Sequence, residues 1–148
     1  METFIAEKRL AAEASQERVW DLLGTLIFDS LEGLEKMEII DENNFRAELK
    51  AKAFGLPLTW HLRGEMIDIS PPASLSVKLT AKSKWDLITV VQKITFSLDA
   101  AGEGETVLLC RAMAEDLPPL MRWAMLGEVK KLAQQIFDKI EERLKQLV

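Results

Sequence analysis

The sequence predicts an α+β fold in which a curved antiparallel sheet of seven strands wraps around one long C-terminal helix. Residues 34–115 form short segments of alternating apolar and polar residues separated by turns, which is typical of an antiparallel meander. Residues 120–147 instead place apolar side chains at helical spacing. One helix cannot fill the concave side of such a sheet, so the remaining space is either filled by large side chains or left as a cavity.

The N-terminal third supplies the first strand and two short helices. Residues 3–13 alternate and predict a strand, after which Ser15 can cap a helix over residues 16–23. We expect Gly24 and Thr25 to break this helix and a second one to run over residues 26–31, ending at Gly33.

Six further strands follow, and the alternation in each assigns its two faces. In residues 44–53, Phe45 and Leu49 share one face while Arg46 and Lys50 share the other, which predicts a sheet with one solvated side. The expected strands cover residues 34–40, 45–53, 58–69, 75–84, 88–98 and 106–114.

Composition limits the class of protein. A chain of 148 residues, 48% hydrophobic and 29% charged, suits a single domain over residues 1–148. The net charge of -5 and the lack of a basic run argue against nucleic acid as a partner. The single cysteine, Cys110, excludes an internal disulfide, and no signal peptide or membrane span is recognisable, so we expect a cytoplasmic protein.

Alternate connections of the meander differ in chemistry. Those at residues 41–44, 70–74 and 100–105 are polar or glycine-rich, whereas those at 53–58, 83–87 and 117–123 are apolar. Because connections two apart share one end of a meander, the apolar ones should cluster. They could form the mouth of a cavity, or they could plug the core. The mouth residues would be Phe54, Leu56, Trp85, Leu120 and Trp123.

Candidate catalytic residues are few. His61 is the only histidine and shares the polar face of its strand, and Cys110 has no basic partner nearby in the sequence. We predict no catalytic residue, metal site or cofactor. Gln92 falls on an inward face, where its amide needs a partner from the protein, from water or from a ligand. Lys8 also falls on an inward face, which predicts a local bulge or a snorkelling stem rather than a ligand anchor.

Two short motifs resemble the helix-grip superfamily of START-related carriers, polyketide cyclases and coenzyme Q-binding proteins. Residues 14–23, Ala-Ser-Gln-Glu-Arg-Val-Trp-Asp-Leu-Leu, are similar to its strand-to-helix signature, and Ile69-Ser70-Pro71-Pro72 is similar to its double-proline turn.

Within that superfamily the chain most resembles the G-subunit family of carbon monoxide dehydrogenase, from about residue 4 to residue 148. Leu34-Glu35-Lys36, Asn44-Phe45-Arg46-Ala47 and Gly55-Leu56-Pro57 carry this resemblance, although Leu31-Glu32-Gly33 stands where members often have Ile-Pro-Gly. The resemblance implies a role beside a dehydrogenase, which would be a protein partner.

The sequence therefore predicts a protein that binds a small hydrophobic or amphipathic molecule, such as a lipid, a quinone or a polyketide-like aromatic, in an internal cavity. The alternative is a cyclase or hydrolase on the same fold. Transient membrane contact at the apolar connections and a homodimer through the outer face of residues 106–114 are further interpretations. The expected ligand-binding residues are Trp60, Leu62, Met66, Leu79, Gln92, Ile94, Cys110, Met125 and Val129.

Overall fold

The fold is known from a computed structural model, which describes residues 2–31, 34–53, 55–86, 88–117 and 119–148. In chain order the elements are β1 (Glu2–Ala12), α1 (Gln16–Ser30), β2 (Glu35–Asp41), β3 (Asn44–Ala53), β4 (Leu56–Ser70), β5 (Ser74–Ser83), the short 3₁₀ helix η1 (Lys84–Asp86), β6 (Thr89–Gly102), β7 (Glu105–Glu115) and α2 (Pro119–Leu147).

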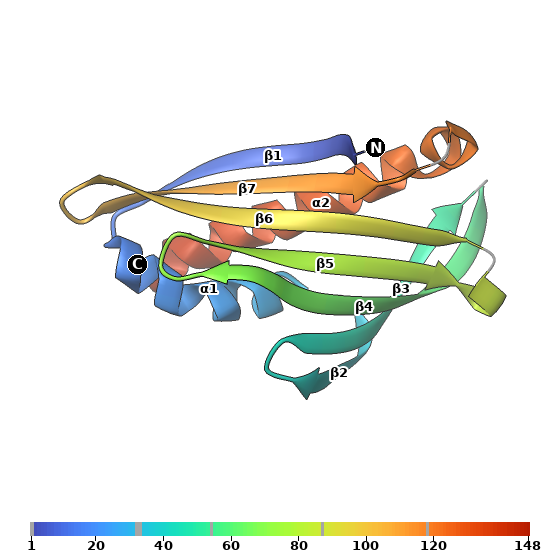
Figure 1. The fold of residues 1–148 in the computed structure, drawn as a ribbon, viewed down its shortest axis with the longest axis horizontal. Coiled ribbons are helices and arrows are strands. Elements are labelled where there is room, and N and C mark those ends of the chain that lie inside the picture. Colours follow the sequence, from blue (N-terminus) through green and yellow to red (C-terminus); the bar gives the residue numbers. More distant parts are fainter. Residues whose placement is uncertain (1, 32–33, 54, 87, 118) are drawn as a thin grey trace.

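The seven strands form one antiparallel sheet in the order β1-β7-β6-β5-β4-β3-β2, which confirms the predicted fold class (Figure 1). Every connection from β2 to β7 joins neighbouring strands, as a meander requires. The first strand closes the sheet by pairing with the last one. Both edges, β1 and β2, therefore come from the N-terminal part of the chain.

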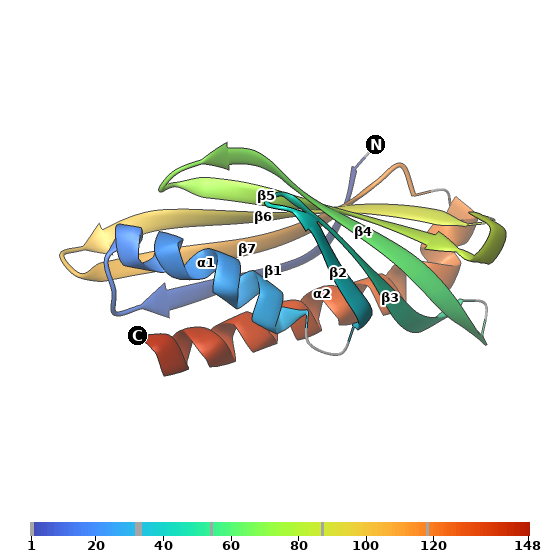
Figure 2. The same cartoon turned by 90° about the horizontal axis from the view of Figure 1, so that it is seen from below.

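Both helices lie on the same face of the sheet (Figure 2). The sheet curves far enough that strands on opposite sides of it, β1 and β3, both contact α2. The buried face of α2 is formed by residues at helical spacing: Met125, Val129, Ala133, Ile136, Phe137, Ile140 and Leu144.

The expected break between two short helices is wrong, because α1 is continuous from Gln16 to Ser30. Its buried residues Val19, Leu23, Leu26 and Ile27 keep helical spacing across Gly24. A glycine in a helix costs only about 1 kcal/mol relative to alanine, and burial of this apolar stripe outweighs that cost. Ser15 caps the helix as expected, because its hydroxyl accepts a hydrogen bond from the Arg18 amide at 3.2 Å.

Ion pairs connect the edge strand β1 to α2. A register shift between Phe4 and Ala6 leaves the Phe4 side chain exposed on the outer face. Lys8 reaches α2, where its ammonium lies 2.6 Å from Asp138 and 3.2 Å from Glu141. The hydrogen bond to Asp138 raises the pKa of Lys8. The lysine on the inward face is therefore an ion-pair partner of the helix.

The turn after β4 contains the predicted double proline, and the peptide bond between Pro71 and Pro72 is cis. Neither helix is both long enough and apolar enough to cross a lipid bilayer, as far as the described residues go.

Gly64 is the position in the sheet where a larger side chain would cost most. It pairs with Phe45 on β3, and a Cβ atom built on Gly64 would lie 2.1 Å from two carbons of the Phe45 ring. Phe45 is only 1% exposed, so its ring has little room to move away. The glycine lets this ring lie flat over the strand and seal the inner face.

We predict that Gly64→Ala lowers the free energy of unfolding by about 1–3 kcal/mol, because the ring and the backbone must shift to relieve the overlap. Urea denaturation measures the effect. Gly127→Ala on α2 is the control, because a Cβ atom there meets nothing within 4 Å and should leave the protein as stable or more stable.

Candidate functional site

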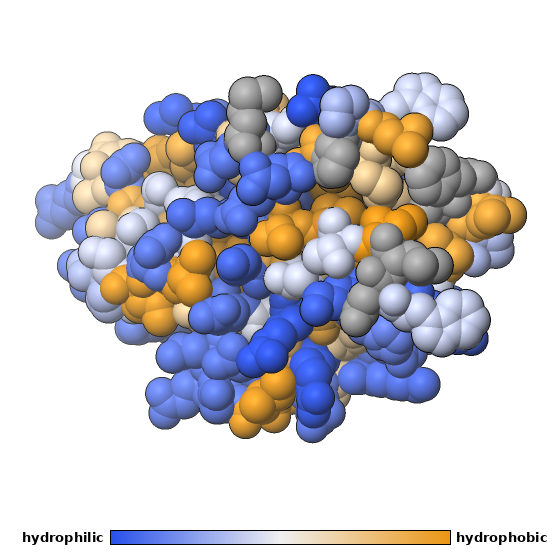
Figure 3. Space-filling view, turned by 45° about the vertical axis from the view of Figure 1, so that its right-hand side comes forward, coloured by the Kyte–Doolittle hydropathy of each residue, from blue (hydrophilic) through white to orange (hydrophobic). Residues whose placement is uncertain are grey.

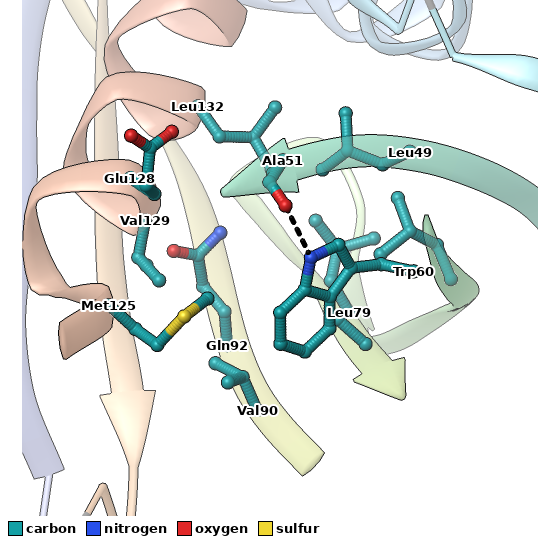
Figure 4. A pocket seen from close by; sticks show the side chains of 12 residues that line it. Leu49, Ala51, Trp60, Leu79, Val90, Gln92, Met125, Glu128, Val129 and Leu132 are labelled. Carbon is teal, nitrogen blue, oxygen red and sulfur yellow. Dashed lines mark hydrogen bonds between the residues drawn. The ribbon is translucent and has the colours of Figure 1, made fainter. Parts of the chain in front are cut away.

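An apolar pocket lies between the N-terminal half of α2 and the strands β3 to β6 (Figure 4). Its cavity volume is about 50 Å³, so large side chains fill most of the space that the curved sheet leaves. The lining residues are Leu49, Ala51, Trp60, Leu62, Leu79, Ala81, Val90, Gln92, Met125, Glu128, Val129 and Leu132.

The structure brings six of the nine expected ligand-binding residues to this pocket: Trp60, Leu62, Leu79, Gln92, Met125 and Val129. Ile94 and Cys110 face the same side of the sheet but lie among buried residues of the core, away from the cavity. Met66 is half-buried and lies further along β4. Alternation assigned the correct face to these three residues, but it does not say which part of that face a helix covers.

Six lining residues were missed by sequence reasoning: Leu49, Ala51, Ala81, Val90, Glu128 and Leu132. A usable signal existed for two of them. Glu128 and Leu132 lie three and seven residues after Met125, so they share the helix face of Met125 and Val129. Glu128 is the informative omission, because it puts a carboxylate at the edge of an otherwise apolar site.

Gln92 supplies the polar group at the centre of the site. It is 4% exposed, and in Figure 4 its amide points from β6 toward α2, between Val129 and Trp60. The Oε1 atom is fully buried and has no hydrogen-bond partner among the described residues. A buried acceptor without a donor costs about 1–3 kcal/mol, so this atom is a functional candidate.

The neighbouring donor is already engaged. The Trp60 indole Nε1 donates to the Ala51 carbonyl oxygen at 3.1 Å, shown as the dashed line in Figure 4. This bond ties β4 to β3 and fixes the orientation of the indole ring as a wall of the pocket. It also leaves the Trp60 N–H unable to serve Gln92.

A second, larger hollow adjoins the pocket. It has a volume of about 460 Å³ and lies between the end of α1, β3 and the middle of α2. Leu49 and Leu132 line both cavities, so these two side chains form the partition between them.

The apolar connections do lie together at one end of the molecule, on the right in Figure 1, beside the N-terminus of α2. Trp85 and Trp123 are each 80% exposed, and Leu56 and Leu120 are more than half exposed. These exposed side chains do not plug the core. Figure 3 turns this end forward and shows apolar residues among hydrophilic ones. Phe54, the fifth residue of the expected mouth, is outside the described residues.

His61 and Cys110 are far from forming a catalytic pair. His61 lies on the outer face of β4, with its side chain 61% exposed and its Nδ1 atom 3.7 Å from the Glu48 carboxylate. Cys110 is fully buried on β7, and burial raises the pKa of its thiol to about 12. An un-ionised thiol is a poor nucleophile. His61 and Cys110 therefore do not form a pair of base and nucleophile.

We predict that Gln92→Leu raises the free energy of unfolding of the ligand-free protein by about 1–2 kcal/mol, because it removes an unpaired buried acceptor and keeps similar volume. Thermal and urea denaturation measure the change. Gln16→Leu is the matched control and should destabilise, because the Gln16 amide donates to the Leu98 carbonyl at 2.9 Å. A loss of stability in Gln92→Leu would show that the amide is satisfied in the resting protein.

The comparisons with known proteins agree on the fold. A conserved protein from Geobacillus kaustophilus is 21% identical with a TM-score of 0.69, and the match covers 95% of this chain and 94% of that one. Norcoclaurine synthase from Thalictrum flavum is 14% identical with a TM-score of 0.71, covering 99% and 96%. A START superfamily protein from Mycobacterium smegmatis is 15% identical with a TM-score of 0.62, covering 99% and 100%.

These similarities define the class of the protein as one with the helix-grip fold. No model of a protein family matches the chain, and no curated protein is recognisably similar in sequence. The structural relatives therefore establish the architecture, and the function has to be argued from the pocket.

Proposed function

We propose that the protein binds a small hydrophobic or amphipathic molecule in the pocket between α2 and the sheet. The observation that carries this proposal is an apolar cavity with a buried, unpaired amide oxygen at its centre. Apolar walls provide affinity in proportion to the area they remove from water, at roughly 25 cal/mol per Å². A few polar groups then orient the ligand.

The small volume sets a condition on binding. A cavity of about 50 Å³ holds no more than part of a ligand, so the rest must displace side chains or extend past the partition. The groove of about 460 Å³ beyond Leu49 and Leu132 offers that room. The favoured ligand is accordingly elongated, with a narrow end inside the pocket and an apolar body along α2. A lipid, a quinone derivative or a polyketide-like aromatic has this shape.

The structural relatives support small-molecule binding by this fold. Norcoclaurine synthase has been solved in complex with dopamine and hydroxybenzaldehyde, so at 14% identity the same fold holds small aromatic molecules. A cyclase- or hydrolase-type activity is the weaker proposal for this chain, because neither His61 nor Cys110 lines the pocket.

We predict that Ala81→Leu abolishes most binding of the uncharged probe Nile red, because the larger side chain enters a cavity that it nearly fills. Fluorescence titration measures the affinity, and a thermal melt checks the fold. Ala11→Leu places the same substitution on an exposed position of β1 and should leave binding unchanged. Equal binding by wild type and Ala81→Leu would place the probe elsewhere and contradict the proposed site.

We further propose that ligands reach the pocket from the apolar end, in transient contact with a membrane. The pocket lies just inside this end, because β3 and β5 finish there and α2 begins there (Figure 1). Exposed tryptophans are favoured at the boundary between water and lipid, where the indole ring and its N–H both find partners. The Lys84 ammonium lies 4.7 Å from the centre of the Trp85 ring and adds a positive charge beside it.

The combined variant Leu56→Ser and Trp123→Ser should slow transfer of Nile red from phospholipid vesicles, while the free energy of unfolding changes by less than about 0.5 kcal/mol because both side chains are exposed. Stopped-flow fluorescence measures the transfer rate. Ile69→Ser is the control, because Ile69 is also exposed but lies at the opposite end of β4. Unchanged transfer by the double variant would exclude this end as the route.

The resemblance to the G-subunit family of carbon monoxide dehydrogenase supports a more specific proposal, that the protein acts as an accessory to a dehydrogenase. Native mass spectrometry of freshly purified protein separates the alternatives. A co-purifying small molecule favours a carrier. An empty protein that captures a dehydrogenase favours an accessory role without a ligand.

A further inference from the structure

The two polar side chains of the pocket each present an oxygen that accepts hydrogen bonds. Of the twelve lining residues, ten are apolar and only Gln92 and Glu128 carry polar side-chain atoms other than the engaged indole N–H of Trp60. The unpaired atom of Gln92 is its carbonyl oxygen, which only accepts hydrogen bonds. A carboxylate likewise accepts and does not donate. The site therefore offers acceptors on both the sheet side and the helix side.

The protein itself does not satisfy these acceptors. The Trp60 N–H points to the Ala51 carbonyl oxygen, and the described residues place no other donor within reach of Gln92 Oε1. Glu128 is half-buried and forms no hydrogen bond or ion pair with any described residue. The basic side chains of α2 nearest in sequence, Lys130 and Lys131, are exposed to solvent.

In Figure 4 the sheet acceptor and the helix acceptor both lie on the side of the cavity away from the Trp60 ring. Glu128 precedes Val129 on α2, and in Figure 4 its carboxylate lies on the same side of the cavity as the Gln92 amide. Leu132, one turn further along the helix, borders the larger groove. A molecule held by its polar end between β6 and α2 would thus direct its apolar part toward the partition formed by Leu49 and Leu132.

We propose that this pocket selects ligands whose polar end donates hydrogen bonds, such as a phenol, an alcohol or an amine on an apolar body, through Gln92 Oε1 and the Glu128 carboxylate. The inference rests on the proposed function and narrows its ligand class. A hydroquinone fits, because both of its hydroxyl groups donate. An oxidised quinone fits less well, because it has no donor for Gln92 Oε1 or the Glu128 carboxylate and can only accept from the Gln92 amide N–H groups.

Discrimination between a donor and a non-donor of similar size tests the proposal. The probes are para-butylphenol and its methyl ether, which share one apolar body and differ in whether the oxygen carries a proton or a methyl group. Wild-type protein should bind the phenol about tenfold more tightly than the ether, which is the ratio that one average hydrogen bond provides. Isothermal titration calorimetry measures both affinities.

Two variants assign the preference to the proposed atoms. The phenol has one O–H, so the ratio of affinities should fall toward one in whichever of Gln92→Leu and Glu128→Leu removes its acceptor, while the ether binds at least as well as before. Gln134→Leu is the control on an exposed position of α2 and should keep the wild-type ratio. Because Glu128 is only half-buried on a helix, its variant tests the proposal even if Gln92→Leu perturbs the core.

The outcomes separate this inference from the proposed function. Equal affinity for phenol and ether in wild-type protein would overturn the donor preference and leave the binding pocket standing. A preference that survives in both variants would overturn the assignment to Gln92 and Glu128. Failure of wild-type protein to bind either probe, combined with unaltered Nile red binding in Ala81→Leu, would overturn the pocket and the inference with it.

Discussion

The packing of α2 against the concave face of the sheet holds every other part of the fold in place. Without the helix, Trp60, which is 2% exposed and lines the cavity together with Met125 and Val129, would face water. Ala133 is fully buried near the middle of the helix, and its small side chain allows close approach to the sheet. The ion pairs from Lys8 to Asp138 and Glu141 hold the β1 edge against the same helix.

The position of the pocket follows from this packing. The sheet is wider than one helix, so α2 alone does not cover its inner face. Along its C-terminal half α2 packs beside α1, where Arg143 and Asp29 form an ion pair at 2.8 Å. Along its N-terminal half no second helix packs beside it among the described residues, and the cavity lies there, under Met125 and Val129. The unequal lengths of the two helices thus decide at which end of the fold this cavity lies.

The chemistry of the pocket divides the work between its walls and its two polar groups. Apolar walls remove ligand surface from water but distinguish poorly between molecules of similar shape. Hydrogen-bonding groups in a dry site discriminate strongly, because a wrong ligand leaves them unpaired. The unpaired Oε1 atom of Gln92 lowers the stability of the ligand-free protein, and the same lack of a partner leaves this atom available to a ligand. Its retention at the centre of an apolar cavity is therefore easier to explain by recognition than by stability.

Local patterns in the sequence were enough to predict the order of the strands along the chain, the long final helix and the face that most strand residues take, Phe4 beside the register shift being an exception. Alternation of period two placed Trp60, Leu79 and Gln92 on the inner face, and the helical spacing after Leu120 defined the buried stripe of α2. Such patterns depend only on backbone geometry, which is local. They also located the apolar connections at one end, because a meander reverses direction at every turn.

Which residues become neighbours in the core, in contrast, depends on how segments far apart in the sequence pack together. The helix α1 continues through Gly24 because the apolar residues on both sides of this glycine are buried by packing in the core. Whether Ile94 or Ala81 borders the cavity depended on where α2 crosses the strands, and whether Gln92 finds a donor depended on Trp60 bonding to Ala51 instead. Each of these outcomes results from side-chain volumes and partners brought together from distant parts of the chain. Periodicity carries no information about them, because it describes a residue's face and not its neighbours.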